Sequence, residues 1–111
     1  MATHHASPLE LVDLETWADD LKTEKSKAIV KGSGIELARL VIEAGADMHQ
    51  SGYCSVEGEV VIHCLEGEII VRTPEGSQTL RSGQLVFLDR EREHALSGVQ
   101  RSVVLLTIEL C

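Results

Sequence analysis

Histidine and cysteine are the residue types in this 111-residue sequence whose side chains could bind a metal ion or act as nucleophiles. Neutral imidazole suits Zn, Fe, Ni and Cu, whereas a thiolate favours softer metals such as Zn or Cu. A usable metal site needs three or more such ligands, so they act only where the fold brings several of them together. The chain contains His4, His5, His49, His63 and His94, together with Cys54, Cys64 and Cys111.

The cysteines indicate free thiols rather than a disulfide framework. Their number is odd and no two of them have the CxxC spacing, whereas small secreted domains carry even sets of paired cysteines. Cys64 lies within an apolar stretch, which favours a small core residue over a nucleophile. We assign no catalytic residue from these patterns.

The charge balance and the hydropathy pattern argue against two classes of partner. The chain has 18 acidic and 10 basic residues and a formal net charge of −8, so it would repel a nucleic-acid backbone at long range. No uninterrupted apolar run approaches the ~20 residues that a membrane helix needs, and residues 1–20 lack a basic start followed by an apolar stretch. We therefore expect a cytoplasmic protein with neither nucleic acid nor membrane as a partner.

Two segments of different pattern must position these side chains within a single domain. Residues 1–25 are expected to form an N-terminal tail with a short amphipathic helix over 8–21, where apolar residues recur at spacings of three and four. From residue 26 onward, extended runs are broken by Gly, Pro or Ser about every eight to twelve residues, which is typical of an antiparallel barrel or sandwich. We expect an all-β fold with strands over 27–31, 35–42, 60–65, 69–73, 78–81, 85–88, 94–95 and 103–110.

Two of the expected strands are apolar on both faces, which a half-exposed strand would not be. They contain the runs VVI at 60–62 and VVLL at 103–106. The barrel interior covers one face, and the other face needs a second sheet, the helix or another subunit. Since an exposed apolar sheet face usually marks an interface, we expect a homodimer.

Three stretches between residues 45 and 110 carry a family resemblance. The run VIHCLEGE at 61–68 is followed by a hairpin over 69–80, and the run GQLVFL at 83–88 is followed by His94, eleven residues after Gly83. The first run is similar to the end of the first cupin motif, and the last run with His94 is similar to the second. The chain therefore resembles a small single-domain cupin, an RmlC-like jelly roll or double-stranded β-helix, which implies a cupin β-barrel over residues 26–111.

The metal motif of the family is degenerate in this chain. Cupin sites draw two histidines and a glutamate from the first motif and one histidine from the second, which the resemblance places at His94. Val60 stands at the glutamate position, seven residues before Gly67, and the adjacent Glu59 would face the other side of the strand. The first motif's histidine pair is reduced to His49.

The resemblance implies that His94 enters the barrel interior near the end where His49 arrives from the preceding loop. A third donor is then needed, and two alternatives are open. Cys54, where some related small cupins carry a histidine, would favour Zn or Cu, whereas a displaced Glu57 or Glu59 would favour Fe(II) or Mn. A divalent metal ion, Zn, Fe, Mn or Ni, is thus a candidate cofactor.

His63 is expected on the outer face of its strand. Counting alternate residues from Val60 places Ile62 and Cys64 inward as well, so the side chain of His63 points the other way. A histidine among apolar neighbours is more often a packing or interface residue than a metal ligand. His63 becomes a ligand candidate only if the register of the strand is shifted.

The turn at 89–93, with the sequence DRERE, is more charged than the resemblance implies, because the family has proline and glycine there. We expect a solvated loop. Arg90 or Arg92 could nevertheless hold the carboxylate of a ligand at the barrel mouth.

Three functions follow as hypotheses. The first is a barrel that binds a small molecule, with or without a metal ion, in a pocket lined by Ile62, Val86 and Leu106 and oriented by His94. The second is a metal-dependent dioxygenase or isomerase with Tyr53 as general acid. The third is a metal-free degenerate cupin that acts as a dimeric structural or regulatory protein, which the missing glutamate and histidine favour.

Overall fold

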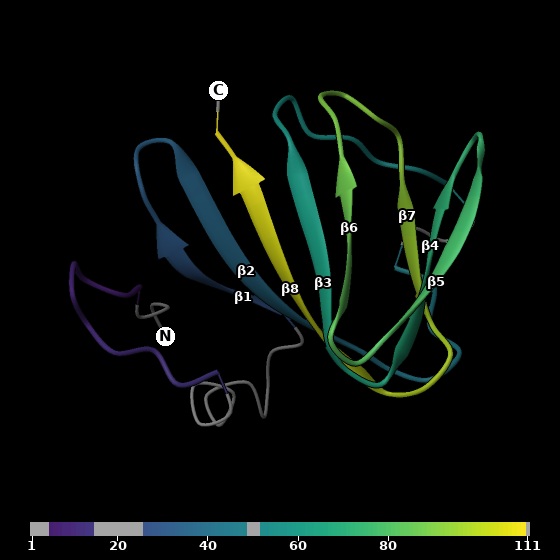
Figure 1. Cartoon of the computed structure of the whole chain (residues 1–111), viewed down its shortest axis with the longest axis horizontal. Helices are drawn as coiled ribbons and strands as arrows, with labels where there is room; N and C mark the ends of the chain where they lie inside the picture. Colours follow the sequence, from purple (N-terminus) through teal and green to yellow (C-terminus); the bar gives the residue numbers. More distant parts are fainter. Residues whose placement is uncertain (1–4, 15–25, 49–51, 111) are drawn as a thin grey trace.

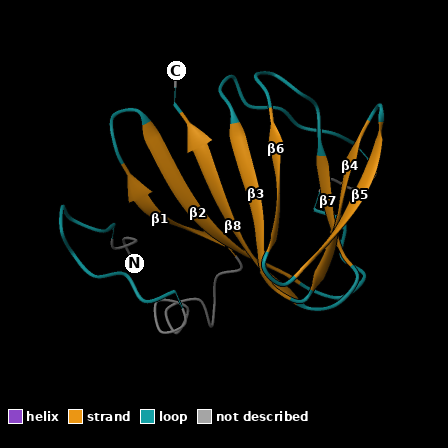
Figure 2. Ribbon diagram, viewed as in Figure 1, coloured by secondary structure: helices purple, strands orange, loops and turns teal. Residues whose placement is uncertain are grey.

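The computed structural model describes residues 5–14, 26–48 and 52–110, and this part of the chain forms two antiparallel β-sheets and no helix (Figure 2). The strands are β1 (Ser26–Lys31), β2 (Ile35–Ile42), β3 (Val60–Glu66), β4 (Glu68–Thr73), β5 (Gly76–Arg81), β6 (Gln84–Leu88), β7 (Ala95–Gly98) and β8 (Ser102–Glu109). The larger sheet has the order β1-β2-β8-β3-β6, and the smaller sheet has the order β5-β4-β7.

The hydrophobic core lies between the two sheets, which face each other in Figure 1. Ile62 and Val104 contribute from the larger sheet, and Ile69, Val71 and Leu96 contribute from the smaller one. All five side chains are at most 3% exposed. The apolar runs of the sequence therefore supply the inner faces of both layers, as expected for a barrel.

Strand β3 shows how the sequence sets these faces, because its residues alternate between two environments. Val60, Ile62 and Cys64 are buried in the core, and the residues between them are only half-buried. Ile62 pairs with Val86 of β6 on one side and with Leu106 of β8 on the other. The inward set expected for this strand from period-two alternation matches the observed burial.

Residues on both sides of 49–51 pair with β7, or with the residue just before it, along the edge that does not contact β4. The Met48 N–H donates to the Leu96 carbonyl at 3.0 Å, and Asp47 forms an isolated bridge with Ser97. Cys54 forms a second isolated bridge, with His94. The bridge thereby holds Cys54, in the segment before β3, beside His94, the residue before β7.

The observed strands lie close to the expected ones. Strand β5 begins at Gly76, two residues earlier than expected, because Thr73 and Gly76 pair directly and leave only Pro74 and Glu75 in the turn. Strand β7 runs on to Gly98 because it pairs with β4 as far as Ile69. The described ranges contain no helix whose length and hydropathy would allow it to span a bilayer.

The helix expected over 8–21 is not formed in its described part, residues 8–14. Leu9 has a φ of 69°. Ser7 and Glu10 close a turn in which the Glu10 N–H donates to the Ser7 carbonyl and the Ser7 N–H donates to the Glu10 carboxylate. The Ala6 N–H donates to the Ile29 carbonyl at 2.7 Å, which ties the segment to β1. The left-handed backbone at Leu9 cannot continue a right-handed helix, which explains why none forms here. Residues 15–21 lie outside the described part.

Candidate functional site

Cys54 and His94 lie opposite each other at one end of the barrel. The Cys54 N–H donates to the His94 carbonyl at 2.9 Å, and the His94 N–H donates to the Cys54 carbonyl at 2.8 Å. Residues paired in this way carry their side chains on the same face. Because the core residue Leu96 is two positions beyond His94, alternation places both side chains on the face toward the barrel interior. The Cys54 Sγ lies 3.6 Å from the His94 Nε2.

The imidazole of His94 is oriented by the backbone. Its Nδ1 lies 3.2 Å from the Arg92 carbonyl oxygen, and since a carbonyl can only accept, Nδ1 carries the proton. Nε2 then presents its lone pair toward the Cys54 thiol. A bond from the far ring nitrogen to a carbonyl is the arrangement that fixes metal-binding histidines in proteins. His94 is only 5% exposed, so this orientation is held by packing as well.

The thiol of Cys54 is neutral in this setting. Cys54 as a residue is exposed, yet partial desolvation of its sulfur raises the pKa of the thiol above its ordinary value. The thiolate, not the thiol, is a strong metal ligand, so a bound metal ion would have to displace this proton to solvent.

The spacing of the two ligand atoms fits a tetrahedral zinc ion. Zinc with a Zn–S bond of about 2.3 Å and Zn–N bonds of about 2.0–2.1 Å holds the sulfur and nitrogen roughly 3.5–3.6 Å apart. The observed separation of 3.6 Å would allow both atoms to bind one ion without movement. Cys54 and His94 could thus supply two of the donors that such a site would need.

The described residues do not supply the third donor. No group of three His, Cys, Asp or Glu side chains in residues 5–14, 26–48 and 52–110 is placed to hold a metal ion. Glu59 pairs through its backbone with Glu109 and lies one position before the inward-facing Val60, so alternation turns its side chain away from the core. Glu57 is exposed, and His49 lies outside the described residues.

His63 lies on the face of β3 that points away from the core. It is half-buried and pairs with Leu85 of β6 and Leu105 of β8. The register is therefore not shifted, and His63 is separated from the Cys54–His94 pair by the sheet itself. Its neighbours are those of a packing or interface residue.

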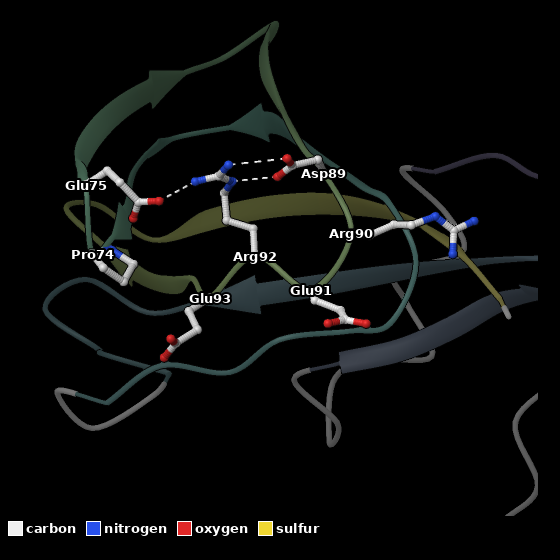
Figure 3. A pocket seen from close by; sticks show the side chains of 7 residues that line it. All are labelled: Pro74, Glu75, Asp89, Arg90, Glu91, Arg92 and Glu93. Atoms are coloured by element: carbon white, nitrogen blue, oxygen red, sulfur yellow. Dashed lines mark hydrogen bonds and ion pairs between the residues drawn. The ribbon is translucent and has the colours of Figure 1, made fainter.

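The charged loop between β6 and β7 is closed by ion pairs within the chain. Arg92 lies between Asp89 and Glu75 and bonds both, with Nη2 3.2 Å from the Asp89 Oδ2 (Figure 3). Hydrogen bonding to Arg92 holds the pKa of Asp89 below its ordinary value. Arg90 is 3.1 Å from the Glu109 carboxylate. Both arginines that the sequence suggested for a ligand's carboxylate are thus engaged by acidic side chains of the chain itself.

Arg92 has a positioning role that the sequence did not reveal. Its side chain ties the β4–β5 turn, through Glu75, to the loop that leads into β7, while its carbonyl accepts from His94. A pocket of about 410 Å³ opens at this loop, with Glu91 and Glu93 directed away from the ion pairs (Figure 3). The alternating charges of the DRERE turn could have indicated the ion pair between Arg92 and Asp89, but not the bond from His94 to the Arg92 carbonyl.

The four residues expected to line a ligand pocket do not lie in one pocket. Ile62 is fully buried, and Val86 and Leu106 pack against the core. Val86 also lines a groove of about 290 Å³ between β6 and the β4–β5 hairpin. Tyr53 is 42% exposed, and the Arg72 guanidinium lies 5.7 Å from the centre of its ring, which gives the tyrosine a packing role.

Solved structures share this arrangement of strands. A conserved protein of unknown function from Streptococcus pyogenes aligns with a TM-score of 0.75 and 16% identity over 100% of this chain and 96% of its own. A cupin-2 domain containing protein from Shewanella frigidimarina aligns with a TM-score of 0.75 and 10% identity over 90% and 95%. An RmlC-like cupin from the same organism aligns with a TM-score of 0.68 and 15% identity over 78% and 75%. No protein-family model and no curated protein matches the sequence.

Proposed function

We propose that this chain, which has the RmlC-like cupin fold, binds a divalent metal ion between Cys54 and His94 and a small molecule at the same end of the barrel. The proposal rests on the 3.6 Å separation between the thiol sulfur and the His94 Nε2, whose lone pair is turned toward it. A thiolate ligand favours Zn over Fe or Mn, and the separation agrees with zinc geometry. Zinc is therefore the metal that we expect.

Zinc binding is expected to strengthen as the pH rises. Because burial raises the pKa of the Cys54 thiol, the free protein holds that proton at neutral pH and zinc must displace it. The apparent zinc affinity should then increase by about tenfold per pH unit between pH 7 and 8. Competition with a chromophoric chelator would measure both this slope and the stoichiometry. An affinity that is flat with pH, or less than one zinc ion per chain, would contradict the proposal.

Binding is favoured over catalysis by the surroundings of the pair. Tyr53, the candidate general acid, packs its ring against Arg72. Arg92, the candidate for holding a substrate's carboxylate, is bonded to Asp89 and Glu75. We therefore propose a binding protein rather than a dioxygenase or an isomerase. A cytoplasmic location belongs to this proposal, because a reducing compartment keeps the Cys54 thiol available to the metal.

We also infer that two copies of the chain associate through the outer face of the larger sheet. Phe87 and Leu85 are 57% and 54% exposed there, and they flank Val61 and His63 of β3. We call these four residues, with Leu105 of β8, the outer patch. None of them carries an acidic or basic side chain apart from the histidine. In a two-fold dimer this patch meets itself, so a chain of net charge −8 can associate there without bringing carboxylates together.

A negative charge in the outer patch should separate the two copies. Replacing Phe87 by glutamate places a carboxylate beside its own copy across the two-fold axis, so we expect a monomer at micromolar concentration. Thr79→Glu is the matched control, because Thr79 is exposed on β5 of the other sheet. Light scattering after size exclusion measures the mass. A wild-type mass of one chain, or an unchanged dimer in Phe87→Glu, would refute the proposed interface.

A further inference from the structure

Arg39 is a buried arginine on the face of β2 that points away from the core. Its neighbours Leu40 and, two positions further, Ile42 belong to the core, and alternation turns Arg39 to the other side. It is nevertheless only 6% exposed. Its Nε and Nη1 are buried and have no hydrogen-bond acceptor among the described residues. Buried polar groups in proteins are almost always hydrogen-bonded, so two unpaired donors on one charged side chain require an explanation.

A small pocket opens beside this guanidinium. It has a volume of about 210 Å³ and is lined by Leu14, Arg39, Leu65, Glu66 and Val103. Among the described residues, Arg39 is the only cation that lines this pocket, and three of the other four lining residues are aliphatic. The pocket is smaller than the usual site for a drug-sized ligand, so only a small molecule would fit in it.

The charges around the pocket define which anion it can hold. Burial lowers the pKa of Arg39, and the Glu66 carboxylate opposes that shift, but an arginine stays protonated in proteins. Glu66 is exposed and does not bond Nε or Nη1. A guanidinium pairs most strongly with a carboxylate or a phosphate. The negative charge of Glu66 at the rim disfavours a divalent anion more than a monovalent one.

We propose that this pocket is a binding site for a small aliphatic monocarboxylate. The carboxylate accepts from Arg39, and the aliphatic tail contacts Leu14, Leu65 and Val103. The site lies outside the barrel and involves neither Cys54 nor His94. Its test is therefore independent of the test of the proposed metal centre.

Sodium isovalerate, a branched five-carbon carboxylate, is a suitable probe, and isovaleramide is its uncharged counterpart. We expect calorimetry to detect isovalerate binding in the wild-type chain, with isovaleramide and sodium phosphate at equal ionic strength binding at least about tenfold more weakly. Arg39→Gln should weaken isovalerate binding by at least about tenfold, because the charge-assisted bonds are lost. Equal binding of isovalerate and isovaleramide, or unchanged binding in Arg39→Gln, would overturn the proposal.

A second variant keeps the test decisive if Arg39→Gln fails to fold. Glu66 is exposed, so Glu66→Gln should fold normally, and removal of its charge should tighten isovalerate binding by about two- to fivefold. Unchanged or weaker binding in Glu66→Gln would contradict the proposed charge arrangement. The same titration in Phe87→Glu tests another source of the carboxylate. Binding seen only in that variant would mean that a second copy of the chain fills the pocket, which would also overturn the proposal.

Discussion

Replacing Cys54 by serine should weaken zinc binding by at least about a hundredfold, because loss of an outer hydrogen-bond partner of a metal ligand already costs about 10–100-fold and Cys54 would be a direct ligand. The serine hydroxyl keeps the size of the side chain but supplies no thiolate at neutral pH. The isolated bridge between Cys54 and His94 uses only backbone atoms, so the fold should persist. Competition titrations with a chromophoric chelator, with circular dichroism as the folding check, measure the effect.

His94→Ala should produce a loss of the same order, since the proposed site cannot form with one described donor. The matched control is the double variant His4→Ala/His5→Ala, which removes a histidine pair that could bind zinc adventitiously near the N-terminus. Zinc affinity should survive this control. If instead the control loses zinc and His94→Ala retains it, the metal proposal fails and the metal-free alternative for this barrel is favoured.

The Cys54→Ser variant also separates zinc from the harder metals. A site built on Glu57 or Glu59 would bind Fe(II) or Mn and would be insensitive to Cys54→Ser. The structure makes this outcome unexpected, because Glu59 alternates away from the core and pairs with Glu109 through its backbone. Metal selectivity in Cys54→Ser is therefore a direct test of which of the two donor sets acts.

The strands could be predicted from the sequence because burial on one face enforces a period of two. In β3, a shift of one residue would move Val60, Ile62 and Cys64 out of the core, so only one register satisfies the apolar pattern. The same alternation placed His63 and Glu59 away from the interior. Where both the pattern and the turn residues agree, as in the hairpin around Pro74 and Glu75, the prediction was close to the structure.

The candidate site was less predictable because it depends on pairing between segments far apart in sequence. Cys54 and His94 are brought together by a single bridge outside the named strands, and no local pattern specifies it. The role of Arg92 depends on its carbonyl oxygen, whose position the side-chain sequence does not encode. The position of Arg39 inside the largely apolar run ARLVI was a signal in the sequence, but its burial depends on the segments packed over β2.

A single methyl group at Gly67 should destabilise the fold strongly, because both the backbone conformation and the space around it require glycine. Gly67 links β3 to β4 and has a φ of +88°, which non-glycine residues rarely adopt. A Cβ there would lie 2.4 Å from the Ser102 Oγ and 2.6 Å from the Arg101 carbonyl oxygen. Neither neighbour can yield cheaply, because one is backbone and the other is fully buried.

The hydroxyl of Ser102 is fixed by bonds that the substitution would break. It accepts from the Glu68 N–H at 2.9 Å and lies 2.8 Å from the Gln100 carbonyl, to which it can donate. Displacing it would leave buried polar groups unpaired, at about 1–3 kcal/mol, in addition to about 1–2 kcal/mol for the left-handed backbone. We expect Gly67→Ala to lower the free energy of unfolding by about 3 kcal/mol or more.

Two further glycines separate the causes of this loss. Gly83 has a nearly equal φ of +85°, but a Cβ at that position would meet no atom within 4 Å, so Gly83→Ala should show the backbone term alone. Gly34 has neither a positive φ nor a close neighbour, and Gly34→Ala should be nearly neutral. Urea denaturation followed by circular dichroism gives the three free energies. If Gly67→Ala and Gly83→Ala lower the free energy of unfolding equally, the close contact of the Gly67 position with Ser102 and Arg101 makes no contribution to the loss.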